Sequence, residues 1–226
     1  MMEEFLNKSR LILQSLNESI SSFYDLYDSL SDDDDNQRQD LLRAIILFSC
    51  SGIDAIVKQL VNDTLELVIV RDEGAFTQFK NFTEKKIVTK NDAGYDSKLL
   101  ATLFTCDNPK SVLIDLLKRE LTCNSLQSAD ELLKVGSYFN IETNSLEQNK
   151  TELDELKTIF RVRNQITHEM DVDMGAVDFQ RRERTREEIK RYSDHIISLA
   201  EKFINLVGEK LNNATIVSEL EQLMSI

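Results

Sequence analysis

Residues 41–70, LLRAIILFSCSGIDAIVKQLVNDTLELVIV, carry the densest run of apolar residues in the chain. We expect them to lie in one long helix over residues 37–70. Two apolar faces run along that helix, one formed by Leu41, Ile45, Phe48 and Ile56 and the other by Ile46, Ile53, Val57 and Val61. A helix that is apolar on two faces lies inside a bundle. Four charged residues interrupt the run, so we expect a buried core helix and no membrane span; they are Arg43, Asp54, Lys58 and Asp63.

The composition of the whole chain favours helices. One proline and six glycines in 226 residues, with 41% hydrophobic residues, are typical of an all-α globular domain. We expect a single helical domain over residues 1–226, with a core at about 37–207, a helical insertion at 88–140 and a short terminal helix at 209–226. Further helices are expected at 3–30, 73–87, 109–121, 127–140, from about 146, and at 183–207, with an acidic loop at 32–35.

Charge and cysteine usage exclude several classes of protein. A net charge of -13 disfavours nucleic-acid binding through overall charge, although a local basic site remains compatible with it. Cys50, Cys106 and Cys123 form no C-x-x-C pair, so neither a structural zinc site nor a disulfide framework is expected. The acidic N-terminus lacks the layout of a signal peptide, and the expected location is the cytoplasm. No residue cluster has metal-ligand spacing, and no cofactor is expected.

The residues that carry chemistry are Arg163, Asn164 and His168, within Phe160–Asp171, FRVRNQITHEMD. Imidazole transfers protons near neutral pH, and guanidinium stabilises charge that develops on a phosphate. Arg163 falls on the apolar face of the helix, beside Ile159 and Met170 and about 140° from His168 on an ideal wheel. A single site that uses both side chains therefore needs a distorted helix or a two-fold interface. Alternatively, Arg163 pairs with a buried carboxylate and His168 only marks the helix end.

Basic residues nearby are candidates for holding an RNA backbone. Residues 181–191, RRERTREEIKR, contain six Lys/Arg and three Glu. The predicted RNA-binding residues are Arg161, Arg181, Arg182, Arg184 and Arg186. The alternative is a solvated helix face with local Glu–Arg pairs.

Two other polar positions allow a structural and a functional interpretation. On the narrow polar edge of the central helix, Asp54 or Ser51 could face an active site, or Asp54 could form a local pair with Lys58. His195, the second histidine, is interpreted as a structural or surface residue.

The string RNQITHEMD, followed by RRERTREE, resembles HEPN domains, and in particular small stand-alone HEPN proteins of the MAE_28990 type. Their hallmark is an arginine, often followed by asparagine, then four to six positions to a histidine. The resemblance covers about residues 37–207, and only the motif region is specific. It implies a helical bundle that dimerises through the motif helix, and metal-independent RNA cleavage by 2'-hydroxyl attack. Arg163, Asn164 and His168 match the catalytic motif, and Asp54, or Ser51, is the candidate for an additional polar residue.

Many HEPN proteins are toxins or anti-phage defence effectors, so the expected partners are RNA, a second copy of the chain, and an antitoxin or defence-system protein. Other HEPN domains are non-catalytic modules that bind a nucleotide or a partner protein, and this alternative stays open. A third alternative is a structural bundle whose motif is only a buried ion-pair network.

Overall fold

The computed structural model describes residues 2–88, 95–126, 128–175 and 177–212. Apart from a 3-10 turn at Asp32–Asp34 and two isolated β-bridges, the regular elements in these ranges are helices. They are α1 (Met2–Ser29), α2 (Asp35–Arg71), α3 (Glu73–Ile87), α4 (Ser97–Thr105), α5 (Pro109–Thr122), α6 (Ala129–Tyr138), α7 (Thr143–Leu146), α8 (Lys150–Glu169) and α9 (Arg186–Asn212). The predicted all-α class is confirmed.

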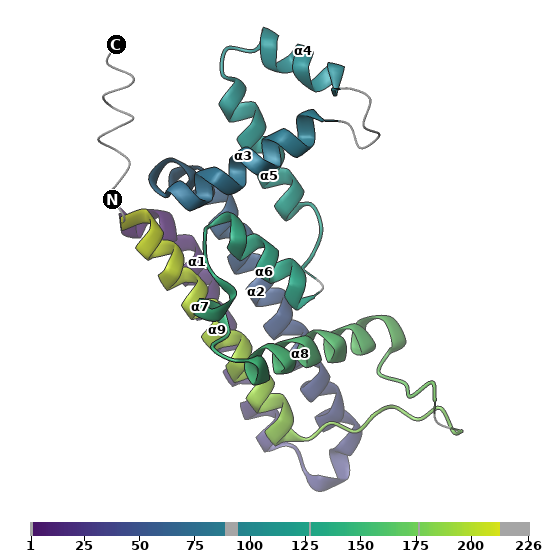
Figure 1. Ribbon diagram of the computed structural model, residues 1–226. Helices are drawn as coiled ribbons and strands as arrows, with labels where there is room; N and C mark the ends of the chain where they lie inside the picture. Colours follow the sequence, from purple (N-terminus) through teal and green to yellow (C-terminus); the bar gives the residue numbers. More distant parts are fainter. Residues whose placement is uncertain (1, 89–94, 127, 176, 213–226) are drawn as a thin grey trace.

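Helix α2 is the centre of the bundle. Figure 1 shows α1, α2 and α9 running side by side along the molecule, with α8 crossing the lower part of α2. Fifteen residues of α2 are buried, among them Leu42, Ile53 and Val68. Among the described helices, α2 alone has the length and apolar composition of a membrane span. Half of its most apolar 18-residue stretch is buried inside the protein. That burial is typical of a core helix.

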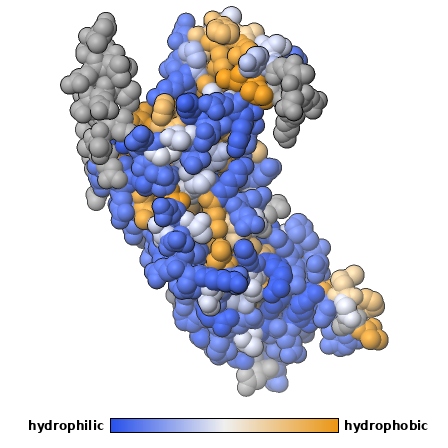
Figure 2. All heavy atoms as spheres, viewed as in Figure 1, coloured by the Kyte–Doolittle hydropathy of each residue, from blue (hydrophilic) through white to orange (hydrophobic). Residues whose placement is uncertain are grey.

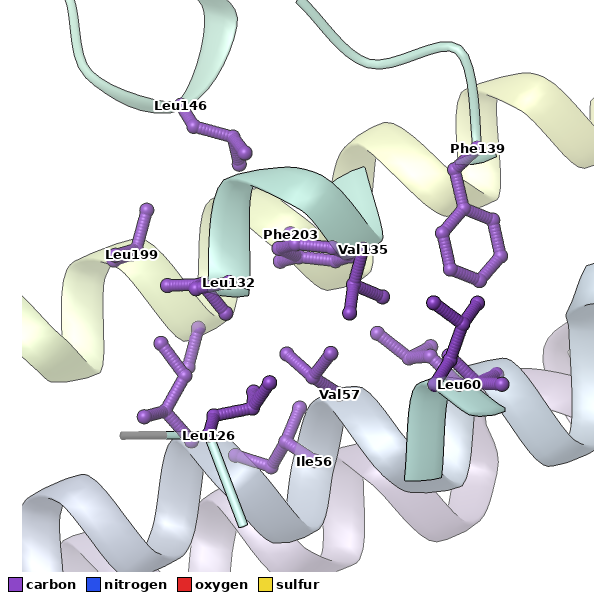
Figure 3. Close-up of a cluster of buried hydrophobic side chains, with 14 of the residues drawn as sticks. Ile56, Val57, Leu60, Leu126, Leu132, Val135, Phe139, Leu146, Leu199 and Phe203 are labelled. Atoms are coloured by element: carbon purple, nitrogen blue, oxygen red, sulfur yellow. The ribbon is translucent and has the colours of Figure 1, made fainter. Parts of the chain in front are cut away.

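The apolar core between α2, α6 and α9 holds the short helices in place. In Figure 3, Leu132 and Val135 of α6 point toward Val57 of α2, with Phe203 of α9 behind them. The rings of Phe139 and Phe203 meet edge to face, with centroids 6.0 Å apart. Because α6 is fixed between two long helices, its first turn has a defined place beside α8.

Three details differ from the sequence-based expectation. Helices α4 and α7 were not predicted, because short helices contain too few residues to display a periodic pattern. We expected Gly208 to separate the terminal helix, but α9 continues through it to Asn212. A Cβ atom at Gly208 would lie 3.1 Å from a side-chain carbon of Leu6, so this glycine serves the packing of α9 on α1. The remainder of the predicted terminal helix, 213–226, lies outside the described residues.

The predicted apolar face of α2 is wrong at one position. Phe48 is 49% exposed, whereas its neighbours Ile45 and Ile46 are fully buried. Its ring instead meets Phe23 of α1 edge to face at 5.0 Å. This contact lies at the edge of the α1–α2 interface and not in the core.

Candidate functional site

Helix α8 carries the motif, and local contacts fix both of its ends. At the start, the side-chain oxygen of Asn149 accepts a hydrogen bond from the Glu152 N–H at 3.1 Å, and the Glu152 carboxylate accepts from the Gln148 N–H at 2.9 Å. At the end, Met170 adopts the left-handed conformation, with φ of 53°. Met170 was expected on the apolar face but is 65% exposed, because the helix stops before it.

A cleft of about 510 Å³ lies between α8 and the first turn of α6. Its α6 side is lined by Ser128, Ala129 and Asp130, and its α8 side by residues that include Lys157, Arg161, Asn164, Gln165 and His168. Three residues predicted from the sequence therefore lie together, namely Arg161, Asn164 and His168. The exposed imidazole of His168 projects from the last turn of α8.

Lys157, Arg161, Asn164 and His168, spaced four, three and four residues apart, form one face of α8, which we call the α8 stripe. In the part of the chain that the structure describes, Lys157, Arg161 and His168 have no carboxylate within ion-pair distance. Most other basic side chains of this acidic protein do, for example Lys58 with Asp54. The α8 stripe therefore offers positive charge to an anionic ligand in the cleft.

Arg163 lies away from this cleft. Its side chain is half-buried, and its Nη1 donates a hydrogen bond to Oδ1 of the neighbouring Asn164 at 3.0 Å. It also lies near Cys50 of α2, where burial raises the pKa of the thiol to about 12 despite the opposing charge of Arg163. Since α8 is one continuous α-helix through residues 163–168, no distortion brings Arg163 beside His168. Within one chain, Arg163 is connected to the cleft only by its hydrogen bond to Asn164, which lines the cleft.

Asp54 and Ser51 do not line this cleft. The Asp54 carboxylate accepts one hydrogen bond from the Lys58 ammonium and another from the backbone N–H of Leu126, both at 2.9 Å. It therefore holds the loop before α6, which is a structural task and not the predicted catalytic one. Ser51 faces a separate groove between α1 and α2, lined also by Phe48 and Gly52.

The predicted basic strip after α8 is neutralised by acidic partners. Arg181 pairs with Asp40 at 2.7 Å, Arg182 with Glu169 at 3.3 Å, and Arg186 forms two hydrogen bonds with Asp28. Arg184 is 9% exposed and pairs with the buried Asp171 at 2.6 Å. The prediction that Arg184 binds RNA is therefore corrected, because a buried, paired guanidinium does not reach a phosphate backbone.

The segment after α8 also exposes apolar side chains. Met174, Val177 and Phe179 are 65%, 100% and 59% exposed. They lie on the loop that projects at the lower right of Figure 1, where Figure 2 shows an apolar patch beside hydrophilic surface. Apolar side chains that gather on a protruding surface are typical of contacts with another molecule.

His195 occupies a separate polar cluster. Its Nδ1 lies 2.9 Å from the Glu155 carboxylate, and its Nε2 lies 2.9 Å from that of Glu147, whose side chain is 1% exposed. Burial alone would lower the pKa of His195, but the two glutamates outweigh this effect through hydrogen bonds and charge, and the pKa is raised. His195 is thus structural, as predicted: it joins α9 to α7 and α8.

This cluster predicts how stability depends on pH. Because the folded-state pKa of His195 is raised, its contribution to the free energy of unfolding is fully present below the unfolded-state pKa of about 6.5. That contribution is lost as pH rises through the higher folded-state value. Urea unfolding across this window should show stability falling with pH in the wild type and a flatter curve for His195→Gln. Equal slopes in wild type and His195→Gln would contradict the assignment.

Several site residues were not predicted from the sequence. Lys157 could have been found, because it precedes Arg161 by one helical turn on the face that carries His168. Ser128, the N-cap of α6, and Asp130, in its first turn, could not, because their place beside α8 depends on tertiary packing. Within the described ranges, no group of three His, Cys, Asp or Glu side chains is arranged to hold a metal ion.

Comparison with known proteins identifies one related family. A family model described as RiboL-PSP-HEPN matches residues 12–209, which include α2, the cleft and all of α8. This match confirms the HEPN assignment, although its description differs from the MAE_28990 type that the flanking sequence suggested. The chain has no match among the curated proteins or among the solved structures.

Proposed function

Because the chain belongs to the RiboL-PSP-HEPN family, we propose that it is a metal-independent endoribonuclease whose site is the cleft between α6 and α8. The observation that carries this proposal is the α8 stripe. It combines a proton-transferring imidazole, His168, with two basic side chains that have no carboxylate partner in the described structure, Lys157 and Arg161. An anionic RNA backbone fits these charges, and the rest of the acidic protein repels it.

In the proposed reaction, the RNA 2'-oxygen attacks the adjacent phosphorus, and the bond from phosphorus to the 5'-oxygen breaks. His168 either takes the proton of the 2'-hydroxyl or gives a proton to the leaving 5'-oxygen. Arg163, contributed by the second subunit of a dimer, stabilises the extra negative charge that develops on the phosphoryl oxygens. The amide of Asn164, oriented by its hydrogen bond from Arg163, is placed to contact the phosphate or the imidazole. The products are a 2',3'-cyclic phosphate and a 5'-hydroxyl.

The proposed active form is a homodimer in which two α8 helices face each other. Two observations support it. Arg163 and His168 lie on different sides of a continuous helix, so a shared site needs one side chain from each subunit. Apolar side chains next to the end of α8, including Met170, Met174 and Phe179, are exposed in the single chain. A two-fold contact would cover such a surface. In this dimer, each of the two sites combines His168 of one subunit with Arg163 of the other.

The direct experiment is incubation of the purified protein with total RNA in EDTA. We expect the wild type to cleave RNA and His168→Ala to leave it intact, with equal helical content in the two proteins. Arg119→Ala is a matched control, since it removes an exposed positive charge from another helix. Wild-type protein that leaves RNA intact under all conditions would contradict the proposal.

The α8 stripe predicts a specific salt dependence of RNA binding. Replacing Lys157 and Arg161 together with alanine should weaken binding and lower the slope of log affinity against log salt by about two, roughly one for each lost phosphate contact. The double variant Arg181→Ala with Arg186→Ala removes the same charge from side chains that already have carboxylate partners. It should change the slope less. Filter binding at several salt concentrations measures both. Equal slopes in the two double variants would show that the α8 stripe has no special role in RNA binding.

The proposed cellular role is that of a toxin or anti-phage defence effector acting in the cytoplasm, kept inactive by an antitoxin or another protein of the same defence system. HEPN family membership supports it. Induced expression should then arrest growth in the wild type and leave cells that express His168→Ala growing. Normal growth at equal protein levels would contradict this role.

A second candidate function is a non-catalytic module that binds a nucleotide. The volume of the cleft, about 510 Å³, favours it, because this is the size of small-molecule sites. Saturable binding of a mononucleotide without any RNA cleavage would support the second function over the first.

A further inference from the structure

The chain makes a strained turn where α8 ends. Met170 and Asp171 follow the helix with φ of 53° and 61°, although neither is a glycine. Two successive residues in the left-handed region persist only where surrounding contacts hold them. The backbone N–H groups of both donate to the carbonyl oxygen of Gln165, one turn before His168. The conformation of this turn therefore affects the part of α8 that carries His168.

A buried carboxylate holds the turn. Asp171 is fully buried, and its Oδ2 accepts hydrogen bonds from Nε of Arg43 at 3.0 Å and from Nε of Arg184 at 3.1 Å. Its Oδ1 accepts from Nη2 of Arg184 at 2.6 Å. Burial alone would raise the pKa of Asp171, but the two arginines outweigh it, so the pKa is lowered. We call these three residues the Asp171 clamp.

The Asp171 clamp ties α8 to the centre of the bundle. Arg43 belongs to α2, and its Nη2 also donates to the carbonyl oxygen of Arg182 at 2.9 Å. Arg184 also donates to the side-chain oxygen of Gln165 on α8 at 3.3 Å. The last turn of α8 is thus attached to α2 and to the returning chain through a dense set of buried, charge-assisted hydrogen bonds.

We propose that Asp171 is the positioning residue for His168. This inference rests on the proposed function, which gives His168 its task. In the described structure the exposed imidazole of His168 has no hydrogen-bond partner, so the backbone of the last turn fixes the point from which the imidazole extends. Asp171 follows three residues later and fixes that turn, and with it the place of the imidazole relative to Arg161 and Asn164. Asp171 itself does not touch the substrate.

The presence of only two histidines makes a sharp experiment feasible. In protein labelled with ¹³C-histidine, His168 and His195 give one set of signals each, and His195→Gln assigns them. The test variant is Asp171→Asn, which keeps the shape of the side chain and removes its charge. The control is Asp173→Asn, which removes a carboxylate that is about half exposed and lies two residues further along. Spectra are recorded well below the unfolding temperature of each variant.

We expect Asp171→Asn to broaden or split the His168 signal and to leave the His195 signal unchanged, whereas Asp173→Asn changes neither. Should Asp171→Asn fail to fold, Arg43→Lys keeps a cation beside Asp171 but removes the contact with the Arg182 carbonyl, and it should give a smaller change at His168. An unchanged His168 signal in a folded clamp variant would overturn the proposal. Equal changes at both histidines would also overturn it, because they indicate general loosening.

Kinetics give a second readout. In single-turnover cleavage, Asp171→Asn should lower the maximal rate constant about 10–100-fold, because small misplacements of a catalytic group are costly. The RNA concentration at half-maximal rate should change little, since Lys157 and Arg161 remain in place. Loss of RNA affinity without loss of rate would count against positioning. If the wild type does not cleave RNA, the ribonuclease proposal fails, while the spectra still decide whether Asp171 positions His168.

Discussion

Replacing His168 by alanine is expected to lower the rate constant of RNA cleavage by about 10²–10⁴-fold, the usual contribution of general acid–base catalysis. His168 is the imidazole that lines the cleft, since His195 is held between two glutamates in a separate cluster. The His168 side chain is exposed, so its truncation leaves no core cavity and the fold should be retained.

The measurement is single-turnover cleavage of RNA in EDTA, with circular dichroism to compare helical content. His195→Gln is the matched control, because it removes the other imidazole of the chain and should keep most of the activity. A His168→Ala protein that cleaves RNA as fast as the wild type would exclude His168 as acid or base.

Replacing Arg163 by alanine is expected to reduce cleavage by about 10²–10³-fold, the effect of losing a donor that stabilises developing charge. The reason is the shared-site dimer, in which Arg163 of one subunit acts beside His168 of the other. Mixing inactive Arg163→Ala protein with inactive His168→Ala protein should therefore restore activity. About a quarter of the wild-type activity is expected, because half of the dimers are mixed and one of the two sites in each is intact.

The oligomeric state of the purified wild-type protein can be measured directly. The solution mass should be twice the 26.0 kDa of one chain, and a monomer at tens of micromolar would remove the shared-site model. A dimer whose mixed variants stay inactive would instead place the whole site in one chain. In that case Arg163 acts only through its hydrogen bond to Asn164, and Arg161 is the arginine at the cleft.

Periodic patterns in the sequence were sufficient to predict the long helices. The two apolar faces of residues 41–70 predicted a central helix, and α2 lies at the centre of the bundle. Arg161, Asn164 and His168 line one cleft, as their helical spacing requires, because residues three and four apart on a helix are neighbours. These predictions succeeded because they depend only on local geometry.

The arginines after α8 show where such reasoning fails. A count of charges along residues 181–191 predicts a positive strip, but the carboxylates that pair with Arg181 and Arg186 lie 141 and 158 residues away, at Asp40 and Asp28. A local charge count contains no information about these partners. Asp171 belongs to the motif segment, yet its burial between Arg43 and Arg184 depends on the packing of α8 against α2.

The most direct test of the central claim is analysis of the RNA ends that the wild-type protein produces in EDTA. Internal attack by the 2'-oxygen predicts a 5'-hydroxyl on one fragment and a 2',3'-cyclic phosphate or 3'-phosphate on the other. A synthetic substrate with a single 2'-deoxy nucleotide at the cleaved position should remain intact. A requirement for a divalent metal, a 5'-phosphate product, or cleavage of the 2'-deoxy substrate would contradict the mechanism.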